Sequence, residues 1–323
     1  MVVKLEVSLD FMTRYSYAQS TPYNRAHHWF TVVAAAFVFL LIIAGALVTS
    51  NDAGLSVPDW PTSFGSLYRI PPMVGGVKFE HGHRMLAEFI GLLTIAVAVW
   101  TQKVDQRRWM RVLGWSALAT VIAQGVLGGL TVLFYLPPAI STAHATLAQT
   151  FFCIMVSIAF FTSKNWVQPP ATVITADARS LTTISVLTVG TIWLQLIMGA
   201  AFRHSGIRLL PHLIGACVVF GMVNWLVIFT LKRYRATPQL ATPATVLLIL
   251  LGVQIALGLA SYITRYFWST AAAPLASMVV STVAHVACGA LLLATCMILT
   301  IQIHRHAEPD IVRASAVGRT AKA

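Results

Sequence analysis

Residues 79–84, Phe-Glu-His-Gly-His-Arg, place a carboxylate, two imidazoles and a guanidinium at the start of an apolar segment. On a helix, Glu80 and His83 are three residues apart and share a face, whereas His81 points elsewhere. Arg84 follows one position further round. A carboxylate beside an imidazole can move protons, but the same cluster can equally mark a membrane boundary. This stretch alone leaves both interpretations open.

Composition indicates the class of protein. Of the 323 residues, 57% are hydrophobic and 10% are charged, whereas a soluble domain carries about a quarter charged residues. This predicts a multi-pass protein of the lipid bilayer. The net charge of +12 does not indicate a nucleic-acid partner, because the basic residues lie in short segments between apolar stretches, as in oriented membrane proteins. The four cysteines lie within apolar stretches without a CxxC motif, so they predict neither disulfides nor a zinc site.

Eight stretches reach the roughly 20 apolar residues that cross a membrane. They lie near residues 30–49, 84–102, 112–134, 142–163, 181–202, 209–231, 243–264 and 276–303. Sixteen of the 22 lysines and arginines fall on one side of these spans, which predicts cytoplasmic termini and even-numbered helices that run inward from the outer face. No cleavable signal peptide is evident, and we expect a bacterial inner (plasma) membrane.

Four histidines occupy equivalent places near the outer ends of the even-numbered spans: His83, His144, His212 and His285. A single histidine in a membrane helix usually packs or forms a hydrogen bond. Four at similar depth on alternate helices form a pattern, and ionisable residues inside a membrane are functional candidates.

The odd-numbered spans carry a repeated motif, Gln-x-x-x-Gly, at Gln124–Gly128, Gln195–Gly199 and Gln254–Gly258. The first span keeps the glycine, Gly45, but has Leu41 in place of the glutamine. Glycine permits close helix approach, and glutamine can form hydrogen bonds between helices. We therefore predict a helix pair repeated four times, which gives two four-helix bundles related by a pseudo-twofold axis along the membrane normal.

The predicted division of this all-α protein places the bundle boundary at a linker that contains Pro169-Pro170. Its parts are a cytoplasmic tail (1–28), an N-terminal bundle (29–165), a cytoplasmic linker (166–180), a C-terminal bundle (181–305) and a second cytoplasmic tail (306–323).

Two imidazoles that face each other across a four-helix core can ligate heme iron on both axial faces. A mononuclear zinc or copper site would usually recruit carboxylates or thiolates, and the spans hold almost no acids. The residue four places after each histidine is small, which leaves room for a flat macrocycle: Ala87, Ala148, Ala216 and Gly289. Four arginines on the outer side are candidate partners of heme propionates, or of lipid headgroups: Arg84, Arg203, Arg208 and Arg265.

The sequence resembles the heme A synthase family, membrane enzymes that convert heme O to heme A for cytochrome oxidase. The resemblance covers all eight spans. It is carried by residues 45–48 (Gly-Ala-Leu-Val), residues 53–61 (Ala-Gly-Leu-Ser-Val-Pro-Asp-Trp-Pro), Glu80-x-x-His83-Arg84 and the three later histidines. It implies an oxidoreductase that oxidises a ring methyl of heme O to a formyl group through hydroxylated intermediates.

The resemblance also implies residue roles. His83 and His144, with Arg84, would bind the substrate heme O in the N-terminal bundle, and Glu80 would be catalytic. His212 and His285 would be the axial ligands of a resident heme b in the C-terminal bundle, with Arg203, Arg208 and Arg265 as candidate propionate contacts. Heme O synthase and cytochrome oxidase assembly factors are the implied protein partners.

One departure concerns the first outer loop, where many bacterial members carry a cysteine pair and this chain has Val57 and Ser63. Any thiol-based step is then absent or supplied otherwise. The loop, from about Ser50 to Phe79, is either a simple turn at Asp59-Trp60-Pro61 or a lid over the N-terminal heme site.

Two other functions use the same histidines. A di-heme, bis-histidine electron-transfer cytochrome explains four imidazoles but not a glutamate beside one of them. A non-enzymatic heme-binding assembly factor would leave its heme chemically unchanged.

Overall fold

The computed structural model describes residues 22–168, 173–174, 178–267 and 274–308. These residues contain eight helices that are long and apolar enough to cross a membrane, as the sequence predicts. They are α2 (Arg25–Ser50), α3 (Val77–Val104), α4 (Arg108–Leu133), α5 (Pro138–Phe161), α7 (Ala178–Arg203), α8 (Leu209–Tyr234), α9 (Pro238–Phe267) and α10 (Ala276–His306). The short helix α6 (Lys164–Val167) and the parallel two-residue strands β1 (Val173–Ile174) and β2 (Ala307–Glu308) complete the described elements. The protein is therefore an all-helical, multi-pass membrane protein.

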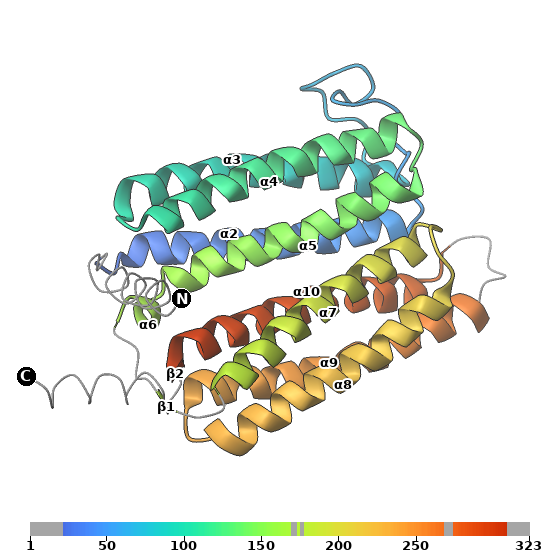
Figure 1. Cartoon of the computed structure of the whole chain (residues 1–323). Coiled ribbons are helices and arrows are strands. Elements are labelled where there is room, and N and C mark those ends of the chain that lie inside the picture. Colours follow the sequence, from blue (N-terminus) through green and yellow to red (C-terminus); the bar gives the residue numbers. More distant parts are fainter. Residues whose placement is uncertain (1–21, 169–172, 175–177, 268–273, 309–323) are drawn as a thin grey trace, which may run out of the picture.

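The long helices pack in two groups of four, α2–α5 and α7–α10 (Figure 1). In the first group, α2 and α4 each lie against both α3 and α5, and in the second, α7 and α9 each lie against both α8 and α10. The groups meet through α2, α5, α7 and α10. The start of α2 and the end of α10 lie at the same end of the molecule. The cytoplasmic location of that end, the pseudo-twofold axis and the predicted domain division stay predictions.

The buried core lies where the two groups meet. Met155 on α5 and Leu299 on α10 are fully buried there, and the Ser157 hydroxyl lies 3.7 Å from the Met297 sulfur. The outer faces of the other helices expose large apolar side chains such as Leu92 and Ile249. A bilayer solvates such faces, so the helices of a membrane protein need no polar exterior at membrane depth.

Six of the eight long helices begin before the predicted apolar spans, and the starts of α2 and α3 carry polar residues. The Asn24 side chain accepts a hydrogen bond from the His27 backbone N–H at 3.0 Å and caps α2, so residues 25–28 are helical rather than part of a tail. Helix α3 begins at Val77, seven residues before the predicted span. Its first two turns carry the polar motif of residues 80–84, which a hydropathy pattern does not mark as helix.

The linker between the groups is attached to the end of α10. Arg305 donates hydrogen bonds to the backbone carbonyls of Asn165 at 3.2 Å and Trp166 at 2.6 Å, and also to that of Gln168. Its guanidinium lies 4.2 Å from the centre of the Trp166 ring. The predicted linker (166–180) therefore contains part of α6, β1 and the start of α7, while Pro169-Pro170 and most of both predicted tails lie outside the described residues.

Candidate functional site

Each of the four predicted histidines packs against a glycine of the preceding long helix. A Cβ added at Gly45 would lie 3.2 Å from Cε1 of His83, and one at Gly128 would lie 3.1 Å from Cε1 of His144. A Cβ added at Gly199 would lie 3.0 Å from Cε1 of His212, and one at Gly258 would lie 3.0 Å from Cε1 of His285. The close approach predicted from the glycine spacing is therefore present, and the approaching group is the imidazole itself. We call these four contacts the glycine seats.

The C-terminal histidines lie next to each other, with ring centroids 6.4 Å apart and ring planes at 78°. A metal ion bound by an imidazole nitrogen at about 2 Å on each side would hold two rings roughly 6 Å apart. Both donors are imidazoles, which suit iron. The spacing of His212 and His285 is therefore that of two imidazoles on one metal ion, although Nε2 and the backbone carbonyl of Gln254 lie 3.3 Å and 3.2 Å from the two ring nitrogens of His285. Their role as axial heme ligands stays a prediction.

The N-terminal histidines are arranged differently. Among the described residues, Nδ1 of His83 and Nδ1 of His144 are buried without a hydrogen-bond partner. The Gln124 amide donates to the backbone carbonyl of His144 at 2.9 Å rather than to its ring. Buried polar atoms are nearly always hydrogen-bonded, so two unpartnered ring nitrogens indicate a site whose contacts are completed by something else.

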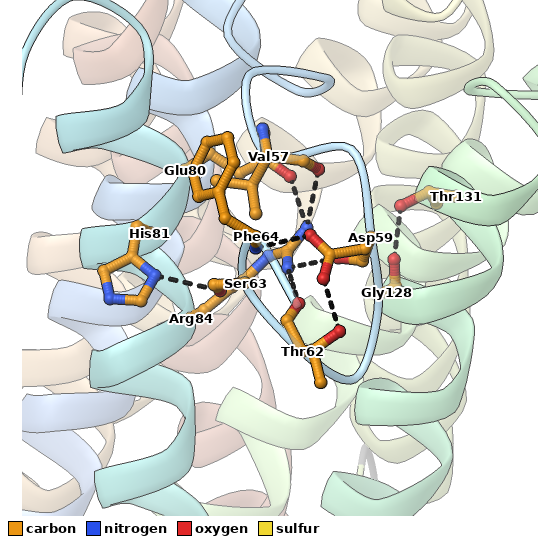
Figure 2. A network of polar contacts seen from close by, with 10 residues as sticks. All are labelled: Val57, Asp59, Thr62, Ser63, Phe64, Glu80, His81, Arg84, Gly128 and Thr131. Carbon is orange, nitrogen blue, oxygen red and sulfur yellow. Dashed lines mark hydrogen bonds and ion pairs between the residues drawn. The ribbon is translucent and has the colours of Figure 1, made fainter. Parts of the chain in front are cut away.

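Glu80 and Arg84 bind each other and the first outer loop, residues 51–76 (Figure 2). Glu80 is 4% exposed, and its carboxylate accepts from the Val57 N–H at 2.8 Å and from the Arg84 guanidinium at 2.7 Å. Arg84 also donates to the backbone carbonyls of Val57 at 3.1 Å, Asp59 at 2.7 Å and Thr62 at 3.1 Å. The Glu80 carboxylate and the Arg84 guanidinium therefore form an ion pair, one helical turn apart on α3. Both nitrogens Nη1 and Nη2 of Arg84 are occupied by the loop and Glu80.

Hydrogen bonds to the Asp59 side chain stabilise the fold of the loop itself. The Asp59 carboxylate accepts from the N–H groups of Phe64 at 2.7 Å and Gly65 at 2.8 Å, and from the Thr62 hydroxyl. Burial alone would raise the pKa of Asp59, but these hydrogen bonds together hold it below its ordinary value. Asp59 is therefore ionised at neutral pH and organises the turn that follows it.

Further contacts attach the loop to the helices. The Ser63 hydroxyl and Nδ1 of His81 lie 3.1 Å apart, and both residues are buried. The Trp60 ring lies on α4 where Gly129 leaves space, since a Cβ there would lie 2.4 Å from the ring. Gly129 follows Gly128, the seat of His144, so the loop reaches the neighbourhood of the N-terminal histidines. The loop is more than a simple turn.

Sequence reasoning missed several of these residues. It treated Val57 and Ser63 only as positions that lack a cysteine, yet the Val57 N–H binds Glu80 and the Ser63 hydroxyl contacts His81. It expected His81 to point away from the site, whereas His81 is buried against the loop. A backbone N–H leaves no trace in the sequence, so only the tertiary structure could identify the Val57 contact.

The three arginines predicted to contact propionates lie at the ends of different helices. Arg203 donates to the backbone carbonyl of Thr49 at 2.8 Å, at the end of α2, and so joins the two helix groups. A guanidinium at a helix C-terminus is favourable because the last carbonyls carry partial negative charge. Arg208 and Arg265 are exposed, at the start of α8 and the last turn of α9. Propionate contacts of these three residues stay predictions.

The loop attachment is testable with Arg84→Lys. A lysine cannot bind several backbone carbonyls at once, so we expect the loop to open more often and trypsin added from the outer side to cut after exposed Arg69 about 10-fold faster. Cleavage would be followed by mass spectrometry in proteoliposomes, with exposed Arg208→Lys as the matched control. Equal cleavage rates in both variants would show that Arg84 does not hold the loop.

The glycine seats are testable by comparing two glycines of α9. Alanine normally favours a helix by roughly 0.5–1 kcal/mol over glycine. At Gly252, where no atom lies within 4 Å of an added Cβ, alanine should leave the thermal unfolding midpoint unchanged or raise it. At Gly258, alanine must displace the His285 ring, so the midpoint should fall. Tryptophan fluorescence during heating measures both, and equal midpoints would contradict the seat.

Comparisons with known proteins match the part of the chain that carries the Glu80 motif. Residues 77–210, which include the Glu80 motif, His144 and Arg203, match the COX15-CtaA family, described as cytochrome oxidase assembly protein. The chain is similar to three proteins named heme A synthase. That of Lysinibacillus sphaericus is 35% identical over 115 residues, which cover 35% of this chain and 37% of that protein. That of Alkalihalophilus pseudofirmus is 29% identical over 117 residues, 36% of this chain and 39% of that protein.

The third relative, from Shouchella clausii, is 25% identical over 263 residues, which cover 72% of this chain and 85% of that protein. The chain thus spans less than two fifths of the length of the first two relatives, but most of the third. By these matches, the chain is similar to the COX15-CtaA family of cytochrome oxidase assembly proteins over residues 77–210.

Proposed function

We propose that the protein is a heme A synthase of a bacterial plasma membrane, which oxidises a ring methyl of heme O to a formyl group through hydroxylated intermediates. The observation that carries this proposal is the buried Glu80 carboxylate on α3, three residues before His83, an imidazole whose Nδ1 has no partner. A ligand site for heme iron next to a fixed carboxylate is what an enzyme acting on a heme substituent requires. The three relatives named heme A synthase support the same activity.

His212 and His285 are the proposed axial ligands of a resident heme b, because their separation and donor chemistry fit one iron. When bound, heme b would supply a one-electron redox centre. The chain's own contribution is to hold the two rings side by side in the low-dielectric interior of α7–α10. Arg203, Arg208 and Arg265 are the proposed partners of heme propionates, because they are basic groups on the same outer side.

His83 and His144 are the proposed ligands of heme O, and Glu80 acts on the substrate beside them. Each oxidation step at the methyl group passes two electrons to an external electron acceptor, releases protons and develops positive charge on the carbon. A carboxylate can accept a proton and stabilise that charge. The Arg84 guanidinium and the Val57 N–H hold the Glu80 carboxylate in place. Arg84 serves the substrate site by holding the loop and Glu80.

The outer loop acts in this proposal as a lid over the N-terminal heme site. It bonds to Glu80 through Val57 and lies against α4 through Trp60, next to the seat of His144. Opening the loop would therefore also release one hydrogen bond of Glu80. The hydrogen bond between Val57 and Glu80 therefore couples substrate entry to the mobility of the Glu80 carboxylate.

The architecture proposed with this function keeps the two bundles (29–165 for heme O, 181–305 for heme b) related by a pseudo-twofold axis, with both termini cytoplasmic. The four glycine seats support it, because the same helix-to-helix contact recurs in each pair. Heme O synthase and oxidase assembly factors remain the proposed protein partners, on the basis of the family.

The hemes of the purified protein test the class of activity directly. We expect extraction and mass analysis to find heme O or heme A alongside heme B. Heme B alone in two firmly bound equivalents would instead identify an electron-transfer cytochrome. Heme O that stays chemically unchanged under turnover conditions would identify a carrier.

Replacing the ligands tests the assignment of the two sites. His212→Ala and His285→Ala should each lower the heme b content, because one axial ligand is lost. His83→Ala and His144→Ala should keep heme b and lose heme O binding. The pyridine hemochrome spectrum of each purified variant measures this. Full heme b content in both C-terminal variants would contradict the pairing.

Glu80→Gln tests the catalytic carboxylate. The amide keeps the size of the side chain but removes its charge, and the loss of a general base costs about 100- to 10,000-fold in rate. We expect a folded protein that retains heme b and accumulates heme O or a hydroxylated intermediate in membranes. The matched control is Glu88→Gln, two turns further along α3 and exposed. A normal yield of heme A from Glu80→Gln would assign Glu80 a structural role.

A further inference from the structure

The first outer loop carries an exposed apolar segment, residues 67–74, which we call the loop tip. Five of its eight residues expose large apolar or aromatic side chains: Leu67, Tyr68, Ile70, Met73 and Val74. Single exposed apolar side chains are common on proteins, but a contiguous group of them usually marks a surface that contacts lipid or another protein. The hydrogen bonds that attach the loop to α3 use none of these five side chains.

The loop lies beside the outer ends of two helices rather than only beyond them. The Trp60 ring lies on α4 at Gly129, four residues, or about 6 Å, before that helix ends. On the other side, a Cβ added at Gly82 would lie 3.8 Å from the methyl carbon of Met73. Gly82 is five residues, or about 8 Å, inside the start of α3. Both edges of the loop therefore reach below the level of the helix ends.

This level coincides with the outer boundary of the predicted spans. The apolar span of α3 begins at residue 84, two residues after Gly82, and that of α4 extends to residue 134. In Figure 1 the loop projects sideways from the outer ends of α3 and α4, on the side away from α7–α10. Helices α3 and α4 expose large apolar side chains up to these ends, at Met85 and Leu133. The loop tip therefore continues the apolar surface that faces lipid.

The charges and aromatic groups of the loop tip suit the headgroup region of a bilayer. Tyr68 is 92% exposed, and tyrosine is enriched where a membrane meets water, because its ring is apolar and its hydroxyl is polar. Arg69 and Lys78 are exposed, and residues 60–79 contain no acidic side chain. Anionic lipid headgroups attract basic residues that lie close to the membrane surface.

We propose that the loop tip inserts into the headgroup region of the outer leaflet, with Leu67, Tyr68 and Ile70 toward the acyl chains and Arg69 at anionic headgroups. Peripheral segments of this kind are held by buried apolar area together with attraction to anionic lipids. The loop is then fixed at two edges, by its hydrogen bonds to α3 and by lipid at its tip. This contact with lipid does not depend on the proposed function, because it involves no heme and none of the histidines.

The first experiment measures the depth of the loop tip with a fluorescent label. Cys217, the one exposed cysteine among the four, is replaced by alanine, and Tyr68→Cys carries a nitrobenzoxadiazole group. The protein is reconstituted into vesicles of phosphatidylcholine and the anionic lipid phosphatidylglycerol. We expect nitroxide-labelled lipid to quench the label more strongly than iodide on both sides of the vesicle. Exposed Val74→Cys repeats the measurement at a second position of the loop tip.

The matched control carries the same label at Ser205→Cys. Ser205 is an exposed polar residue of the turn between α7 and α8, at the same end of the molecule. Its label should emit at a longer wavelength than the Tyr68 label, as expected in water, and iodide should quench it more strongly than nitroxide-labelled lipid does.

A second measurement separates the apolar and charged contributions. Leu67→Ser combined with Ile70→Ser should reduce quenching of the Tyr68 label by nitroxide-labelled lipid, because apolar area is lost. One basic residue near an anionic surface shifts an insertion equilibrium by about fivefold, so Arg69→Gln should also reduce this quenching. The control for charge is Arg179→Gln, an exposed arginine at the opposite end of the molecule, which should leave the quenching unchanged.

The outcomes distinguish lipid from other occupants. Quenching by nitroxide-labelled lipid at both tip positions, reduced in the serine double variant, upholds the proposal. A Tyr68 label that iodide quenches as strongly as the Ser205 label places the loop tip in water and overturns it. A label that is shielded from both quenchers places the loop tip against protein, such as a second copy of the chain, and overturns it as well. Unchanged quenching in Arg69→Gln counts against the headgroup contact.

Discussion

The constraint on which the rest of the structure depends is the space that a glycine leaves for an imidazole. At each of the four seats, a methyl group would come within 3.0–3.2 Å of the ring, closer than ordinary contact. A polar ring at membrane depth has no water to satisfy it, so it is stable only between helices. The glycines let the helix pairs close around the rings, and so set where the pairs α2–α3, α4–α5, α7–α8 and α9–α10 approach each other.

A second constraint operates at the outer end of α3. A carboxylate and a guanidinium in a partly dehydrated position need partners, and the first outer loop supplies them through backbone atoms. The same bonds that make the charges tolerable also fold the loop against the helix. The order of the loop and the position of the Glu80 carboxylate therefore depend on the same contacts. A substitution at Arg84 would disturb both, which is why its effects on activity alone would be hard to interpret.

Both helix groups pack imidazoles against glycines, but the polar groups around those imidazoles differ. Both place imidazoles against glycines, but only the C-terminal half brings its rings within contact distance of each other and adds glutamine contacts. The N-terminal half adds instead a carboxylate, an arginine and a folded loop. Within the described residues, the neighbouring imidazoles His212 and His285 and the Glu80 carboxylate with its loop thus lie in different helix groups. The Arg203 contact with Thr49 joins them at the outer face.

The sequence by itself determined the membrane-spanning helices and the residues that can take part in binding or catalysis. Hydropathy located eight spans, because a helix in a bilayer must be apolar along its length. Helical spacing put four histidines at equivalent depths and Glu80 beside His83, because residues three and four apart share a face. The Gln-x-x-x-Gly motif indicated close helix contacts for the same reason. The start of α3 at Val77 escaped prediction because polar residues interrupt the hydropathy pattern there.

Only the tertiary structure decided which groups complete each site. The partners of Glu80 and Arg84 are backbone atoms of the loop, which every sequence possesses and which only the path of the chain brings into range. The motif is the same at Gln124 and Gln195, yet Gln195 lies 3.0 Å from Nδ1 of His212 while Gln124 donates to the backbone carbonyl of His144. Local spacing fixes the face on which a side chain lies. Contacts between distant segments follow from how all the helices and the loop pack together.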